Sequence, residues 1–123
     1  DLVVFDGLTY LYLSASSAVQ GFVSTDGESF SALAGGEVLH RLGSITDSVV
    51  IDETLVMYVR FFNAQVGEEG INILESSDGE TFSLAENAVV EGGGPSVVAL
   101  PEGGYRMYFV KHLTQEEYNE LFG

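Results

Sequence analysis

The segment Ser24–Phe30, which reads STDGESF, recurs almost unchanged as SSDGETF at Ser76–Phe82. The two copies lie 52 residues apart, a period typical of one supersecondary unit. In each copy an Asp-Gly pair supplies a turn, because glycine adopts positive φ freely and aspartate accepts hydrogen bonds from nearby backbone N–H groups. The phenylalanine that ends each copy is expected to pack between units. The residues predicted to build the repeated turn are Ser24, Asp26, Gly27 and Phe30, and Ser76, Asp78, Gly79 and Phe82.

Three further segments fall into register around these turns. They read DLVVFDGLTYLYLS at 1–14, DSVVIDETLVMYVR at 47–60 and PSVVALPEGGYRMYFV at 95–110. Each combines a β-branched strand, a tight polar turn and an aromatic strand, which predicts a hairpin. Tyr12, Tyr58 and Tyr108 fall at equivalent places. After each of the first two hairpins we expect a third strand (Gln20–Ser24, Ile71–Ser76), the repeated turn and a less regular fourth strand.

The order of these segments predicts an all-β fold of two complete four-stranded antiparallel units and half of a third. The predicted units span residues 1–46, 47–94 and 95–112. Four-stranded units of about 45 to 50 residues are typical of β-propeller blades. A propeller closes with roughly four or more blades. We therefore expect further blades, from the rest of the protein or from another chain, to complete this one.

The last segment, 113–123, changes period and predicts a short helix at Gln115–Phe122. Thr114 is placed as the N-cap and Glu117 completes a capping box, with Leu113 and Tyr118 as a hydrophobic staple. The helix is interpreted as an insertion or tail of the third unit. Two roles are open, docking onto the surface of a unit and capture of a partner.

The repeated phrase S-x-D-G-x-[ST]-F resembles the Asp-box hairpin of sialidase-like and five-bladed glycosidase propellers. The segments DSVVIDETLVMYVR and GPSVVALPEGGYRMYFV are similar to blades of arabinanase-like and invertase-like five-bladed enzymes, and the resemblance extends to about residue 112. It implies part of a carbohydrate-active, glycosidase-like protein that acts on or binds oligo- or polysaccharide. The alternative is a non-catalytic propeller scaffold or binding module that assembles with further blades or chains.

The same resemblance places catalytic carboxylates where the innermost strands begin. Asp1, Asp47 and Pro95 stand at these entrances, so Asp47 is the candidate catalytic residue and Asp1 a second one. Glycoside hydrolysis uses two carboxyl groups with different roles. The alternative for Asp47 is that its carboxylate ends a strand by binding neighbouring backbone N–H groups.

The entrance face is also expected to carry side chains that could bind a sugar. The candidates are Arg60, Phe62, Asn63, Lys111 and His112, with Phe61, Gln65, Glu68 and Glu69 nearby. The alternative is a solvated loop with a core-directed phenylalanine, in which Arg60 pairs with local carboxylates, as Arg106 is expected to do. His40 and His112 are the only histidines and lack the spacing of a metal site, so we expect neither a metal nor a cofactor.

Composition restricts the partners of the chain. Four Lys and Arg against 19 Asp and Glu give a net charge of −15, which repels nucleic acid and anionic lipid. The charge therefore predicts neither nucleic acid nor membrane as a partner, whereas the resemblance and the number of blades imply carbohydrate and further blades. The absence of cysteine excludes disulfides and thiolate catalysis. The chain begins with Asp1 rather than Met, so we expect a removed leader or upstream segment and favour an extracellular or periplasmic location.

Overall fold

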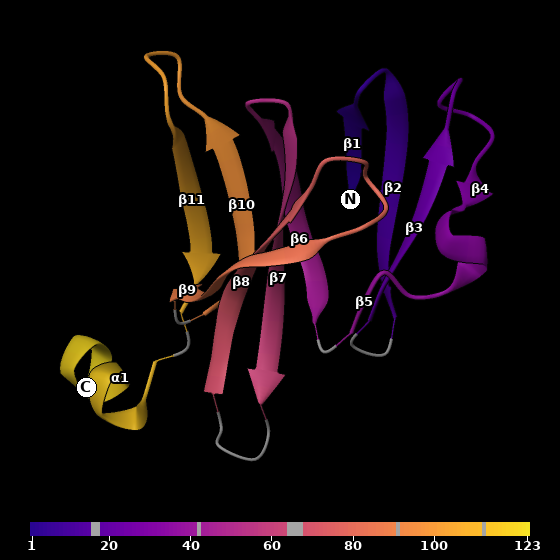
Figure 1. Cartoon of the computed structure of the whole chain (residues 1–123). Coiled ribbons are helices and arrows are strands. Elements are labelled where there is room, and N and C mark those ends of the chain that lie inside the picture. The colour runs from indigo at the N-terminus through magenta and orange to yellow at the C-terminus, as the bar shows by residue number, and fades with distance from the viewer. Residues whose placement is uncertain (16–17, 42, 64–67, 91, 112) are drawn as a thin grey trace.

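The structure is a computed structural model that describes residues 1–15, 18–41, 43–63, 68–90, 92–111 and 113–123. Most of these residues form β-strands (Figure 1). The elements are β1 (Leu2–Phe5), β2 (Leu8–Ala15), β3 (Ala18–Ser24), β4 (Ser31–Ala32), the 3-10 helix η1 (Leu33–Gly36), β5 (His40–Arg41), β6 (Ser44–Ile51), β7 (Thr54–Asn63), β8 (Glu68–Ser76), β9 (Ser83–Val90), β10 (Gly93–Ala99), β11 (Tyr105–Val110) and α1 (Gln115–Phe122).

The strands form three antiparallel sheets that follow one another along the chain. The first has the order β1-β2-β3-β4, with β5 also paired to β3; the second has the order β6-β7-β8-β9; the third contains β10 and β11. Figure 1 shows the sheets side by side, with the β1–β2, β6–β7 and β10–β11 turns at one end of the molecule. The predicted hairpins and the predicted order of strands are therefore confirmed. The second and third sheets begin at Ser44 and Gly93, slightly before the predicted boundaries at 47 and 95.

The first two hairpin turns are two residues long and have positive φ at both central positions. Asp6 and Gly7 have φ of 50° and 76°, and Asp52 and Glu53 have φ of 48° and 62°. This geometry matches the right-handed twist of the flanking strands. In the third turn Leu100 N–H donates to the Gly104 carbonyl at 3.0 Å. Residues 101–103 therefore connect the two strands, so this turn is longer by one residue.

That extra residue shifts the third hairpin relative to the sequence alignment. Tyr58 lies opposite Asp47, and Tyr12 exchanges two backbone hydrogen bonds of 2.9 Å with Asp1. Tyr108 lies opposite Ser96. The equivalence of the three tyrosines is confirmed, whereas the equivalence of residue 95 with Asp1 and Asp47 is wrong by one position. Ser96, which has no carboxylate, occupies the third entrance.

Side chains between the sheets form two hydrophobic clusters. The first cluster joins the first and second sheets through Phe5, Tyr10, Tyr12, Val19, Leu33, Leu55, Met57, Val59 and Leu74. The second joins the second and third sheets through Val56, Tyr58, Ile71 and Val97. Successive residues of β7 alternate between the clusters because successive side chains of a strand point to opposite faces. The second sheet is thus buried on both faces, which explains the nearly continuous apolar run of β7.

The outer faces of the first and third sheets remain exposed. On the first sheet the exposed large apolar side chains include Leu2, Val4 and Leu13, and on the third they include Val98, Tyr108 and Val110. The fourth strand of the first sheet is short, since β4 has two residues and the chain then enters η1 with Ala34 at φ 50°.

Helix α1 has the predicted bounds and the predicted capping box. The Thr114 side chain accepts from Glu117 N–H at 3.2 Å, and the Glu117 carboxylate accepts from Thr114 N–H at 2.8 Å. Docking of this helix onto a unit, one of its two open roles, is not observed, because none of its residues is buried. Leu113 and Tyr118, the expected staple, are both exposed. Among the described residues no helix is long and apolar enough to cross a membrane.

Candidate functional site

The two repeated turns have the same hydrogen-bond pattern, as the sequence predicts. In the first copy Ser24 Oγ accepts from Gly27 N–H at 2.8 Å, and Asp26 Oδ1 accepts from Glu28 and Ser29 N–H at 2.8 and 2.9 Å. In the second, Ser76 and Asp78 accept the corresponding bonds, at 2.8 Å from Gly79 N–H and at 2.9 and 2.7 Å from Glu80 and Thr81 N–H. Each serine hydroxyl also donates to its aspartate at 2.9 Å.

These bonds keep both turn aspartates ionised. The N–H groups of Ser29 and Glu28, with the Ser24 hydroxyl, lower the pKa of Asp26 to about 2. Thr81 and Glu80 N–H groups lower the pKa of Asp78 in the same way. A carboxylate committed to several donors is a structural acceptor, so the repeated phrase builds the corner between the third and fourth strands.

The second turn also docks onto the first sheet. Tyr12 Oη donates to the Gly79 carbonyl at 2.6 Å, and Tyr10 Oη donates to the Asp78 carbonyl at 3.1 Å. Phe82 completes the contact, because its ring meets that of Tyr12 edge-on at 5.6 Å between centroids. The predicted packing of Phe82 between units is therefore confirmed. Phe30 is half-buried and belongs to neither described cluster, since its side of the first sheet faces outward.

The candidate catalytic carboxylates form contacts between successive sheets. Asp47 Oδ2 accepts from Val97 N–H on β10 at 2.6 Å, and its Oδ1 accepts from Ser48 N–H at 3.0 Å. Asp1 accepts a hydrogen bond from the Ser48 hydroxyl on β6. Ser96 is the counterpart of Asp47, so Val97 is the counterpart of Ser48. The contact of Asp1 with Ser48 and that of Asp47 with Val97 are therefore equivalent. We call this pair of contacts the entrance latch.

The latch gives Asp47 the structural role that the sequence left open as an alternative, and it gives Asp1 a corresponding contact. Each carboxylate contacts the residue that follows the entrance position on the first strand of the next sheet. The sequence indicated these carboxylates, but their partners lie 47 and 50 residues away and carry no motif of their own. Only the folded register identifies them.

Two of the predicted sugar-binding side chains, those of Arg60 and Lys111, lie among the described residues, and they belong to different segments of the fold. Arg60 is exposed on β7, where it pairs with Ser44 and Ile71 in backbone register. Lys111 forms an ion pair of 2.8 Å with Glu117 of α1. The side chains of Phe62 and Asn63, with those of Glu68 and Glu69, lie outside the described residues, as do Gln65 and His112.

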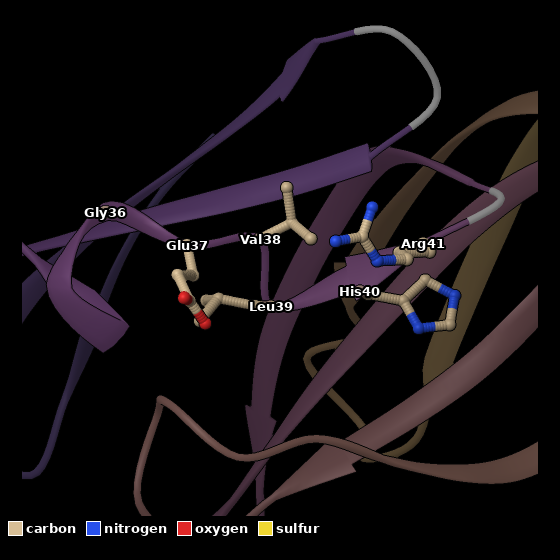
Figure 2. Close-up of a pocket in the computed structure, with 6 residues that line it drawn as sticks. All are labelled: Gly36, Glu37, Val38, Leu39, His40 and Arg41. Carbon is tan, nitrogen blue, oxygen red and sulfur yellow. The ribbon is translucent and has the colours of Figure 1, made fainter.

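A hollow that sequence reasoning missed lies along the segment from η1 to β5, which leads from the first sheet to the second. It measures about 660 Å³ and is lined by Gly36, Glu37, Val38, Leu39, His40 and Arg41. Figure 2 shows the His40 imidazole and the Arg41 guanidinium at one end of this segment and the Glu37 carboxylate at the other. Burial lowers the pKa of His40, which favours the neutral imidazole. The only sequence signal was a histidine next to an arginine in a chain poor in both.

Arg41 is exposed, and no hydrogen bond or ion pair joins its side chain to another described residue. In a chain with four Lys and Arg and 19 Asp and Glu, such an arginine is available to a ligand. Across the described ranges, no group of three or more histidines and carboxylates is arranged to hold a metal ion.

The fold defines an all-β protein built from repeated antiparallel sheets joined by equivalent contacts. Comparison of the chain with protein-family models, with curated protein sequences and with solved structures gave no match.

Proposed function

We propose that the chain supplies consecutive blades of a β-propeller and serves there as a non-catalytic scaffold. The observation that carries this proposal is the entrance latch, made in the same direction from the first sheet to the second and from the second to the third. A contact repeated along successive units produces a regular rotation from unit to unit. In a propeller that rotation arranges the sheets around an axis, with their first strands innermost.

The bonding of the entrance carboxylates favours a scaffold over a glycosidase. A hydrolase needs one carboxyl group free to protonate the leaving oxygen and another free to act as base or nucleophile. Both Asp47 oxygens accept backbone N–H groups, and Asp1 accepts the Ser48 hydroxyl. The third entrance carries Ser96.

The test is the variant Asp47→Asn, with Asp52→Asn as its matched control. Asp52 lies in the exposed β6–β7 turn at φ 48°, a conformation that asparagine also tolerates. Asparagine has one acceptor oxygen for the Ser48 and Val97 N–H groups that Asp47 binds with two, so the free energy of unfolding should fall by about 1–3 kcal/mol in Asp47→Asn alone. Urea unfolding followed by circular dichroism measures the difference.

Hydrolysis of arabino- and fructo-oligosaccharides is measured on the same proteins. A wild type that hydrolyses them, with Asp47→Asn inactive and as stable as Asp52→Asn, would refute the scaffold and support the enzyme.

Carbohydrate binding is the second candidate function, and the hollow at residues 36–41 favours it. The hollow lies in the segment that links the first sheet to the second, which is where the sequence placed the sugar-binding face. Arg41 and His40 offer donors to sugar hydroxyls, and His40 is partly shielded from water. Calorimetric titration with the same oligosaccharides should show binding that Arg41→Ala weakens and Arg60→Ala leaves unchanged. Equal loss in both variants, or no binding by the wild type, would contradict this assignment.

A further inference from the structure

The exposed faces of the first and last sheets are counterparts of faces that are buried inside the molecule. By register, Leu2 and Val4 correspond to Ser48 and Val50, which face the first sheet. Tyr108 corresponds to Tyr12 and Tyr58, which are buried, yet it is 57% exposed. The molecule therefore presents both halves of one internal interface, one half at each end.

The internal interface shows what each half requires. The second turn docks through two tyrosines on β2, the second strand of the preceding sheet. The first turn has the same internal bonds, but no preceding sheet is described, and the space beside Gly27 is open. The third sheet contains the corresponding second strand, β11, on which Tyr108 takes the place of Tyr12. Arg106 takes the place of Tyr10, because both lie two residues before these tyrosines.

Charge distinguishes this pairing from a general apolar contact. Burial, followed by the charges of Asp6, Asp78 and Glu80, raises the pKa of Tyr10, so this position lies within the field of the docked turn. An arginine at the same position would face Asp26 and Glu28, the counterparts of Asp78 and Glu80. Arg106 is exposed, and no hydrogen bond or ion pair joins its side chain to another described residue. One of the few cations of the chain thus stands where the acidic first turn would dock.

We propose that the Arg106 and Tyr108 face of β11 binds the first turn, Ser24–Phe30, of a second copy of this chain. This inference rests on the propeller arrangement proposed above and names its partner. The contact is head-to-tail, so each copy offers one half of it at each end. In the internal interface the second turn also accepts a hydrogen bond at Glu80 Oε1 from Ala34 N–H of η1, at 2.8 Å. The third sheet provides the counterpart of the β2 contacts, which are the contacts that this proposal uses.

The test is the mass of the chain in solution, measured by sedimentation equilibrium over a range of concentrations at about 0.15 M salt, where screening limits repulsion between acidic copies. The wild type should sediment as two or more copies. Arg106→Glu and Glu28→Lys should each weaken association at least tenfold, and the double variant should recover most of the loss. Arg41→Glu, which changes the same charge elsewhere, is the control.

A second pair of variants tests the first turn without a change in charge. Gly27 and Gly7 have the same φ of 76° and open space around them, so alanine strains each turn equally within one copy. In the docked turn, a Cβ on the counterpart Gly79 would lie 2.5 Å from the Tyr10 ring. Gly27→Ala should therefore weaken association, and Gly7→Ala should not.

Three results would overturn the proposal: a wild type that has the mass of one chain, an assembly that Arg106→Glu and Gly27→Ala leave unchanged, or a double charge variant without recovery. A single chain that unfolds cooperatively, and that Asp47→Asn destabilises, would refute the second copy while leaving the propeller scaffold intact. Its exposed faces would then belong to other sheets of the ring.

Discussion

Replacing Gly79 with alanine tests whether the second turn holds the first two sheets together. An alanine Cβ at this position would lie 2.5 Å from two ring atoms of Tyr10 and 2.9 Å from its hydroxyl oxygen. The ring has little room to move, because Tyr10 is buried, stacks on Tyr12 at 6.0 Å and bonds the Asp78 carbonyl. Overpacking of this kind costs about 1–3 kcal/mol.

The backbone strain of the substitution is measured separately with Gly7→Ala. Gly7 has φ of 76°, close to the 80° of Gly79, and a Cβ there meets no atom within 4 Å. Alanine in the left-handed region costs about 1–2 kcal/mol at both positions. The difference between the two variants therefore isolates the contact between sheets.

Urea unfolding measures that difference. We expect Gly79→Ala to unfold with about 1–3 kcal/mol less free energy than Gly7→Ala. With a slope of about 2 kcal/mol per molar urea, its midpoint should be lower by about 0.5–1.5 M. Equal midpoints would show that the second turn does not press on Tyr10 in solution, and the assignment of this turn as a contact between sheets would be refuted.

Three further predictions concern hydrogen bonds within the turns, between the sheets and in α1. Backbone donors lower the pKa of Asp26 to about 2 and lower that of Asp78, so the stability that these carboxylates contribute is present above pH 4 and should fall as the pH drops from 4 toward 2. Urea titrations at each pH should show a shallower loss for the double variant Asp26→Asn/Asp78→Asn. Tyr12→Phe leaves its buried carbonyl partner without a donor and should cost about 1–3 kcal/mol of unfolding free energy, so a loss below 0.5 kcal/mol would contradict the bond. Thr114→Ala should destabilise α1 by about 1 kcal/mol and speed its amide exchange without moving the main unfolding midpoint, since the helix buries no residue; a shifted midpoint would contradict this.

Features set by neighbouring residues could be predicted from the sequence. The hairpins, the repeated turn and the capping box of α1 each depend on residues within a few positions of one another. The order of strands followed from the repetition of these local signals. Such features can be predicted without the tertiary structure, because their hydrogen-bond partners are close in sequence.

Features set by distant contacts could not be predicted. An additional turn residue before Gly104 moved the third entrance from residue 95 to Ser96, and the matching PSVV and DSVV segments concealed the shift. Phe30 and Phe82 end the same phrase but differ in surroundings, because a described sheet covers only the second turn. The partners of Asp1 and Asp47 likewise depend on which strands become neighbours.

The burial of both faces of the middle sheet determines how the chain can unfold. Strand β7 sends Leu55, Met57 and Val59 to one side and Val56 and Tyr58 to the other, so the middle of this sheet has no solvated face. In a linear array of units, stability is the sum of weak intrinsic terms and strong nearest-neighbour terms. If either flanking sheet unfolded, the second sheet would lose one of its two hydrophobic clusters and would unfold as well. The three sheets should therefore melt in a single transition, and local fraying should be confined to α1, which buries no residue.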